Sequence, residues 1–261
     1  NGWNVTSIIM TNKFRFYVAL RKKFPKPKPL PNILGLDINS GRIALSIYNP
    51  RTKSWLKQLY FGKDIGLKQV RYEKRRAILQ KYRDTATPSR AGKKLKKLSG
   101  RQRNYVKTRI WQLVSEITKL AKAYYAGIVI EDIKNLRVSK NQWRKKSRKK
   151  VNRIPYGFFR FALEHKATIE GIPIISIDPK YTSQSCPKCG HRNKSNQKHY
   201  TLFKCRKCGF EANRDRVASQ NICLRADNFW SVNNIQISQT GVAVNQPVCP
   251  DEGVCSQHLI T

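Results

Sequence analysis

Acidic residues are scarce in this chain of 261 residues, which has 15 Asp or Glu against 53 Lys or Arg. The formal net charge of +38 is far more than solubility requires and would strongly attract a polyanion such as nucleic acid. Basic residues occur almost throughout, so the chain lacks the separate apolar face with which a cationic helix binds a membrane. Composition therefore predicts a nucleic-acid partner and disfavours a membrane surface.

Long apolar runs, a secretory signal and internal repeats are also missing. No stretch approaches the length of a membrane span, so we expect no membrane association. The cysteine count of seven is odd, and three cysteines (Cys223, Cys249 and Cys255) follow no regular spacing. This pattern disfavours a disulfide framework and favours the reducing cytoplasm. The chain opens on Asn1 and its one methionine is Met10, so we expect a fragment of a longer product.

The other four cysteines form two CxxC pairs, in CPKCG and CRKCG, with fifteen residues between the pairs. Each pair supplies two thiolates from a tight turn, and the hairpin between them returns the second pair to the same ion. We therefore predict a zinc ribbon over 181–212, with the ligands Cys186, Cys189, Cys205 and Cys208. Four thiolates close the coordination shell, so the zinc is expected to be structural and His191 and His199 to be redundant as ligands.

Apolar periodicity predicts the first half of the fold. KFRFYVAL (13–20) alternates as a strand does, and the proline-rich segment 25–32 reads as a linker. Three further strands are predicted as an antiparallel meander, at 33–38, 42–49 and 54–61. The most basic region follows them: residues 63–109 hold seventeen Lys or Arg against three acids, and we expect basic helices broken at Thr87-Pro88-Ser89.

The second half alternates helices and strands. A clear helical period runs from Val106 to Tyr124, and AGIVIED (126–132) is a strand apolar enough for burial on both faces. The remaining predicted elements are a helix begun by Pro155 and ended by Gly171, a strand at 172–178 and a helix at 213–226. Apart from the ribbon, this is the element order of a ribonuclease H-like α/β fold with a mixed sheet.

The few acids fall at informative places. Asp37 lies inside the apolar strand ILGLDI, Glu131 and Asp132 close GIVIED, and Asp215 opens the last helix. Buried carboxylates are costly unless they are paired or bind cations, and three converging carboxylates would repel one another. Such oxygen ligands suit Mg²⁺ or Mn²⁺. Two ions about 3.5–4 Å apart can activate a water and stabilise the leaving oxygen of a phosphodiester.

Each acid also has a simpler explanation. Asp37 could accept hydrogen bonds from a turn, Glu131 could pair with a basic residue, and Asp215 could cap its helix or interact with the helix dipole. Strand alternation directs Asp132 away from Glu131 and makes it a bystander. No acid taken alone decides between these roles and metal binding, but the set gains weight from the predicted element order.

Three polar or basic segments remain. Tyr181–Gln184 either contacts nucleic acid or is a polar linker, and Cys223 is expected in the core. The loop 144–153 holds seven basic residues in ten, and Trp143 beside it either stacks on a base or packs against the body. We predict that the loop binds a phosphate backbone through Arg144, Lys145, Lys146, Arg148, Lys149 and Lys150.

Four sequence segments carry a resemblance to a known family: GLDINSG, IVIEDIKNLR, the run from IPYGFFRF to SCPKCG, and CRKCGFEANRDRVASQNI. They resemble the TnpB/OrfB proteins of insertion sequences, which are related to type V CRISPR effectors, and the match covers about residues 33–226. The resemblance implies a RuvC nuclease domain with an inserted zinc ribbon. It also implies RNA-guided cleavage of DNA on the prokaryotic nucleoid, with a noncoding guide RNA held largely through its backbone.

The resemblance also implies residue roles and domains. Asp37, Glu131 and Asp215 occupy the catalytic positions of the family, and the four ribbon cysteines occupy its zinc positions. The implied domains are a wedge-like end and linker (1–32), a RuvC-like core with a basic helical insertion (33–180), the zinc ribbon (181–212), the final RuvC helix (213–226) and a tail expected to be flexible (227–261).

Two departures from the family pattern matter. Val217 stands where the family usually has asparagine, although Asn221 is retained, and the family usually has a longer N-terminal half. A second hypothesis is therefore a nuclease-inactive RNA- and DNA-binding regulator of the transposon, or a decayed fragment. A third is a true transposase that performs strand transfer.

Overall fold

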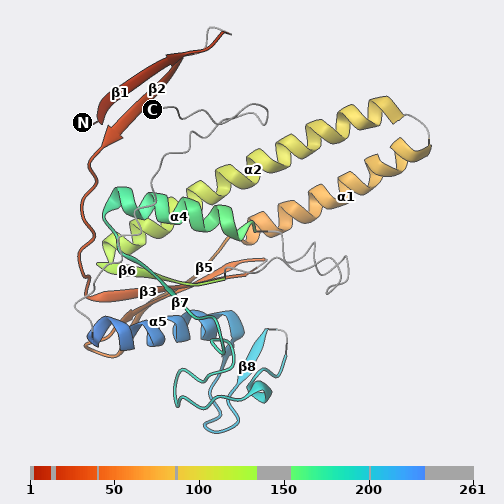
Figure 1. Cartoon of the computed structure of the whole chain (residues 1–261). Coiled ribbons are helices and arrows are strands. Elements are labelled where there is room, and N and C mark those ends of the chain that lie inside the picture. The colour runs from red at the N-terminus through yellow and green to blue at the C-terminus, as the bar shows by residue number, and fades with distance from the viewer. Residues whose placement is uncertain are drawn as a thin grey trace.

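A computed structural model describes residues 3–12, 16–39, 41–85, 88–133, 154–199 and 201–232. Its centre is a five-stranded mixed sheet in the order β5-β4-β3-β6-β7 (Figure 1). The antiparallel meander predicted from the sequence is confirmed as β3 (Asn32–Ile38), β4 (Ile43–Asn49) and β5 (Ser54–Phe61). On the other side of β3, the parallel strands are β6 (Ala126–Glu131) and β7 (Ile174–Ile177).

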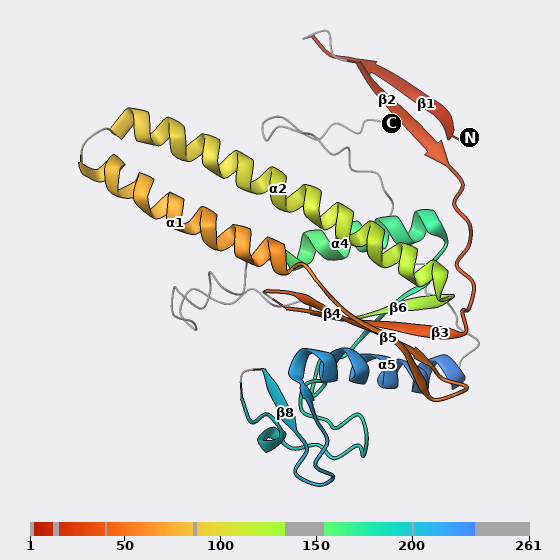
Figure 2. The ribbon, with the colours of Figure 1, turned by 180° about the vertical axis from the view of Figure 1, so that it is seen from behind.

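Helices cover both faces of the sheet, as both views of the ribbon show (Figures 1 and 2). One face carries α1 (Lys63–Thr85), α2 (Pro88–Ala123) and α4 (Tyr156–Glu170). The opposite face carries α5 (Arg214–Val232). This arrangement explains why β3 is apolar almost throughout: its successive side chains enter two different cores, one under each layer of helices.

The two cores follow from strand alternation. Leu34 and Leu36 of β3 pack in the larger core with side chains from α2 and α4. Ile33 packs in the smaller core with Ile222 and Cys223 of α5, which confirms Cys223 as a core residue. The Cys223 thiol also donates to the carbonyl oxygen of Ser46 at 3.3 Å, which links α5 to β4.

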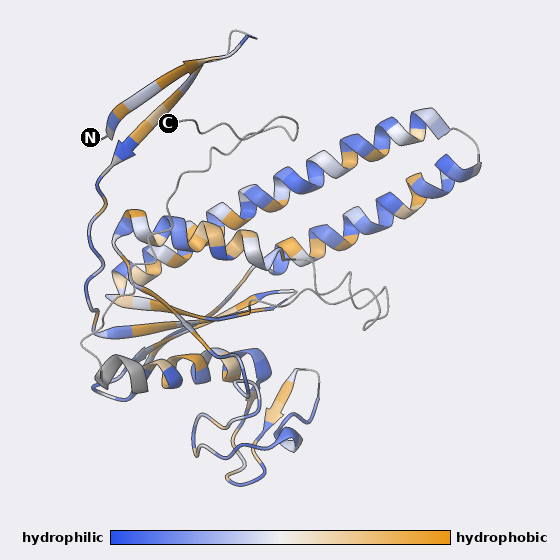
Figure 3. Ribbon diagram, viewed as in Figure 1, coloured by the Kyte–Doolittle hydropathy of each residue, from blue (hydrophilic) through white to orange (hydrophobic). Residues whose placement is uncertain are grey.

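Helix α2 is longer than the segment with the clear helical period in the sequence. It begins at Pro88, whereas that period begins at Val106. Its first half packs on α1 with few apolar residues, and polar contacts supplement them. Asp64 accepts from Arg109 Nε at 2.7 Å, and Gln102 accepts from Arg76 at 2.7 Å. Figure 3 shows that both helices are mostly hydrophilic where they extend beyond the sheet.

Two further predictions require adjustment. The strand predicted at 13–20 is β2 (Phe16–Lys22), paired in a hairpin with an unpredicted strand, β1 (Trp3–Met10). Most apolar side chains of this hairpin are exposed, so no buried face made β1 visible in the pattern. Pro155 is the N-cap of α4 rather than its first residue, whereas Gly171 ends that helix in the left-handed conformation as predicted.

The segment between β7 and α5 forms a small four-cysteine module. It contains a 3-10 helix (Lys194–Asn196) and a short antiparallel hairpin of β8 (Leu202–Lys204) and β9 (Glu211–Asn213). The module lies beside the first turns of α5, on the face of the sheet away from α1 and α2 (Figures 1 and 2). No helix among the described residues is both long and apolar enough to span a membrane.

Candidate active site

Asp37 is a buried carboxylate near the end of β3, with 7% of its surface exposed. Burial, together with the negative charges of Glu131 and Asp215, raises the pKa of Asp37 well above its ordinary value. The Asn39 amide donates to its Oδ2 at 2.7 Å and opposes this shift. Asp37 is therefore close enough to the other two predicted acids to be influenced by their charge.

Glu131 ends β6, which runs parallel to β3, and the pairing of Leu36 with Ile130 sets Asp37 and Glu131 at adjacent strand ends. The side chain is 9% exposed, and burial raises the pKa of Glu131. Thr182 Oγ1 donates to Glu131 Oε1 at 2.6 Å and counteracts the effect of burial. The partner of Glu131 is therefore a buried hydroxyl rather than a directly bonded cation.

Asp215 lies in the first turn of α5 but is not the helix cap. Its N–H donates to Asn213 Oδ1 at 3.1 Å, so Asn213 makes the capping bond. The Asp215 carboxylate instead accepts from Arg42 Nε at 2.6 Å. Arg42 also donates to Asn213 at 3.0 Å, and its guanidinium lies 4.9 Å from the Tyr60 ring centroid. These contacts tie the start of α5 to β4 and β5.

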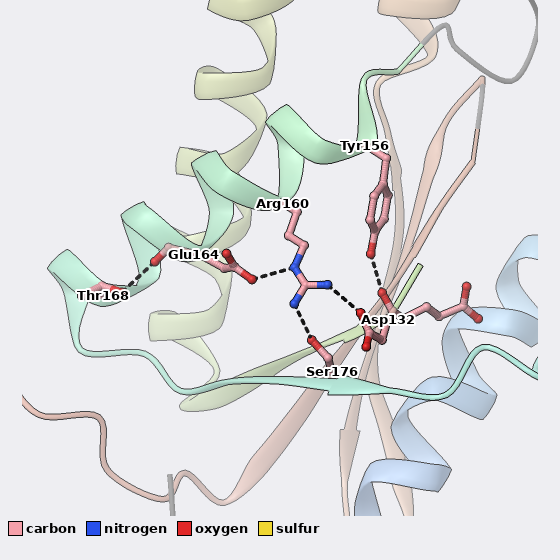
Figure 4. A network of polar contacts seen from close by, with 7 residues as sticks. Asp132, Tyr156, Arg160, Glu164, Thr168 and Ser176 are labelled. Atoms are coloured by element: carbon pink, nitrogen blue, oxygen red, sulfur yellow. Dashed lines mark hydrogen bonds and ion pairs between the residues drawn. The ribbon is translucent and has the colours of Figure 1, made fainter. Parts of the chain in front are cut away.

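Asp132, next to Glu131, belongs to a different network on the opposite side of the sheet, as strand alternation predicts. Arg160 of α4 donates to Asp132 at 2.9 Å and to Glu164 at 2.7 Å, and it also reaches the Ser176 hydroxyl (Figure 4). This acid thus has an ion-pair partner of its own in the α4 layer.

The three carboxylates fit a divalent cation in ligand chemistry and in charge. They supply hard oxygen ligands, and the raised pKa of Asp37 reports a concentration of negative charge that a cation would relieve. Their oxygens are not gathered as tightly as the cysteine sulfurs, which are the one potential metal-ligand group found within the described residues. Arg42 and Thr182 hold Asp215 and Glu131 in separate contacts.

The four predicted cysteines do gather at one point. Their sulfurs all lie within 4.8 Å of one another, with separations of 3.6 Å for Cys186–Cys208 and for Cys189–Cys205. A tetrahedral zinc with Zn–S bonds of about 2.3 Å requires sulfurs about 3.8 Å apart, so the cluster fits that ion. Neither histidine of the hairpin joins this group.

Val217, at the position where the family has asparagine, faces the four-cysteine module. It is fully buried and packs with Cys186, Phe203 and Cys205. The valine therefore helps to hold the first turn of α5, which bears Asp215, against the module.

Sequence reasoning missed the roles of Thr182, Arg42 and Asn213. Thr182 lies in the segment expected either to contact nucleic acid or to be a linker, yet it is 4% exposed and bonds Glu131. No local pattern distinguishes these residues, because each contact joins distant parts of the chain. The predicted nucleic-acid ligands Arg144, Lys145, Lys146, Arg148, Lys149 and Lys150, like Trp143, lie outside the described residues.

Comparison with known proteins adds an independent observation. A family model described as "Cas12f1-like, TNB domain" matches residues 156–222. The chain is 28% identical over 213 residues to the TnpB-like protein MJ0751 of Methanocaldococcus jannaschii, covering 80% of this chain and 74% of that protein. It is 27% identical over 203 residues to the CRISPR-associated endodeoxyribonuclease Cas12f1 of Sulfoacidibacillus thermotolerans, covering 75% of this chain and 46% of that protein.

Solved structures show the same fold. The Cas12f1-sgRNA-target DNA complex matches with a TM-score of 0.57 and 20% identity, over 85% of this chain and 64% of that chain. A CRISPR-Cas12f ternary complex matches with a TM-score of 0.59 and 23% identity, over 80% of this chain and 41% of that chain. The chain thus spans most of the archaeal TnpB-like relative but less than half of the Cas12f1 of Sulfoacidibacillus thermotolerans.

The fold is that of an α/β protein with the architecture found in Cas12f, and it carries a four-cysteine module and a buried carboxylate, Asp37, close to the negative charges of Glu131 and Asp215. The resemblance predicted from the motifs is confirmed: the chain is similar in sequence to a TnpB-like protein and to a CRISPR-associated endodeoxyribonuclease.

Proposed function

We propose that this chain carries the RuvC-like nuclease part of a transposon-associated, RNA-guided DNA endonuclease. The central support is that Asp37 and Glu131 lie at adjacent strand ends and Asp215 lies in the first turn of α5, with the negative charge of the other two raising the pKa of buried Asp37. The mixed sheet with helices on both faces agrees with a ribonuclease H-like fold. The similarity to a CRISPR-associated endodeoxyribonuclease supports cleavage of DNA as its function.

The three carboxylates would hold Mg²⁺ or Mn²⁺, and the four cysteines would hold a structural Zn²⁺. The magnesium site would supply activation of a water and stabilisation of the leaving oxygen of a phosphodiester. The protein's own contribution is placement: β3 and β6 fix two acids at adjacent strand ends, and α5 brings the third. Burial behind helices keeps Asp37 and Glu131 away from bulk solvent, which strengthens their attraction for a cation.

The remaining assignments follow the predicted domains. We propose 1–32 as a wedge-like segment with its linker, 33–180 as the nuclease core, 181–212 as the zinc ribbon, 213–226 as the final helix of the core and 227–261 as a tail. The basic helices α1 and α2 and the loop residues 144–150 would contact guide RNA and target DNA in the nucleoid, through phosphates.

A cleavage assay tests this proposal. Purified chain with a guide RNA from the element's end should nick or cut matching DNA when Mg²⁺ is added. Asp37→Ala should reduce cleavage at least about a hundredfold, because it removes a buried metal ligand. DNA binding, measured by mobility shift, should be unchanged. Cleavage that survives Asp37→Ala would exclude this site as the nuclease centre.

One observation favours a second candidate, a binding protein that does not cut. The ion pair with Arg42 gives Asp215 a partner that a metal would have to replace. If the wild-type chain binds guide RNA and target DNA but yields no cut product with Mg²⁺ or Mn²⁺, the binding function is the correct one.

A further inference from the structure

Thr182 lies between the acidic cluster and the four-cysteine module. Its hydroxyl has one proton and two acceptors within reach, Glu131 Oε1 at 2.6 Å and the Pro179 carbonyl oxygen at 3.1 Å. The shorter bond goes to the carboxylate, and bonds to a charged acceptor are the stronger ones. Since Thr182 is 4% exposed, water does not readily take its place.

Asn221 of α5 holds the backbone at Thr182 and three residues further along. Its amide donates to the carbonyl oxygens of Thr182 at 2.6 Å and of Ser185 at 2.8 Å. Ser185 directly precedes Cys186, the first cysteine of the module, and Asn221 itself is 5% exposed. One turn earlier on the same helix, Val217 packs against Cys186. The segment bearing Thr182 is therefore fixed by α5 and by the module together.

We propose that Thr182 and Asn221 are positioning residues that fix the Glu131 carboxylate and so connect the four-cysteine module to the acidic site. This inference rests on the proposed metal-binding role of Glu131. A glutamate side chain has three rotatable bonds, so its carboxylate at the end of β6 needs a partner to hold it in one position. Among the contacts described for the Glu131 carboxylate, the Thr182 hydroxyl is the direct hydrogen bond. Partners of this kind orient metal ligands, and their loss typically weakens metal binding by about 10–100-fold.

The test compares Thr182→Val with Thr182→Ser in the full, zinc-loaded chain, with Mn²⁺ as the probe. Valine keeps the shape of threonine but removes the hydroxyl, whereas serine keeps the hydroxyl. Titration followed by electron paramagnetic resonance should show Mn²⁺ binding weakened about tenfold in Thr182→Val and close to wild type in Thr182→Ser. Ser183→Ala is the matched control, because the Ser183 hydroxyl contacts Gln197 and not Glu131.

Coupling through Asn221 is tested by a double-mutant cycle. Asn221→Leu should also weaken Mn²⁺ binding, and combining it with Thr182→Val should add less than the product of the two single effects. Zinc content and melting temperature, measured for every variant, identify any that fail to fold. If Thr182→Val fails to fold, Thr182→Ser is compared with wild type instead. Because this variant keeps the hydroxyl and loses the methyl group, Mn²⁺ binding equal to wild type assigns the positioning of Glu131 to the hydroxyl.

Three results separate this inference from the proposed function. If Asp37→Ala abolishes Mn²⁺ binding but Thr182→Val binds like wild type, the positioning role is wrong and the metal site stands. If Thr182→Ser loses as much affinity as Thr182→Val, side-chain packing and not the hydroxyl is responsible, and the inference is wrong. If Asp37→Ala binds Mn²⁺ as well as wild type does, both the metal site and the inference fail.

Discussion

Asp37 has the least favourable environment of the three acids, because it is buried beside two like charges. Its raised pKa means that the native chain holds a proton on Asp37 more tightly than the unfolded chain does. The contribution of Asp37 to the free energy of unfolding is therefore fully present below the pKa that this residue has in the unfolded chain. It is lost as the pH rises toward the pKa that Asp37 has in the folded chain. Near neutral pH, the metal-free protein retains Asp37 at a cost in stability, as functional carboxylates commonly do.

Asp37→Asn should consequently stabilise the metal-free protein. In magnesium-free buffer at pH 7 we expect a gain of about 1 to 2 kcal/mol, which should shrink as pH is lowered toward 4. Urea unfolding of the zinc-loaded protein across this range measures it. Asp132→Asn is the control and should destabilise, because it breaks an ion pair with Arg160. An Asp37→Asn variant less stable than wild type at pH 7 would contradict the account.

At the scale of elements, the close approach of α5 to β3 places Asp215 near the other two acids. Gly35 permits it: a Cβ at this position would lie 2.6 Å from the Ser219 carbonyl oxygen and 2.7 Å from Cys223 Sγ. A side chain in this contact would push the helix away from the sheet. The buried hydrogen bond of 2.7 Å between Ser46 and Ser219 would be strained at the same time.

Gly35→Ala should therefore destabilise the chain by about 1 to 3 kcal/mol. Displacement of α5 should also weaken Mn²⁺ binding, since Asp215 is in its first turn. Gly92→Ala is a matched control within α2, where nothing lies within 4 Å and alanine favours the helix by about 0.5–1 kcal/mol. Equal stability of the two variants in chemical denaturation would disprove the proposed close packing.

The elements show which features the sequence could predict. Runs such as ILGLDI and GIVIED are apolar because both faces are covered, so β3 and β6 were predictable from hydropathy alone. Acids are so few that Asp37 and Glu131 stood out within these runs, as did Asp215 at the start of the last helix. By contrast, Thr182–Glu131 and Arg42–Asp215 join residues 51 and 173 positions apart. Such contacts depend on the three-dimensional arrangement and leave no local pattern.

Over the whole molecule, the sheet separates two kinds of surface. The hydrophilic helices α1 and α2 lie on one face, and the four-cysteine module with α5 lies on the other (Figures 1 and 3). The acidic cluster gathers where β3, β6 and the start of α5 come together. The paired CxxC knuckles are the most conspicuous motif in the sequence, yet under the proposed function they would position the site rather than react.

The central claim is a metal-dependent site built from Asp37, Glu131 and Asp215. The most direct test of this claim compares substitutions of two adjacent acids. Glu131→Gln and Asp132→Asn make the same chemical change in neighbouring residues, one at the end of β6 and the other directly after it. Magnesium-dependent DNA cleavage should fall at least about a hundredfold in Glu131→Gln and stay near wild type in Asp132→Asn. Cleavage that is equal in the two variants would contradict the assignment of Glu131 to the active site.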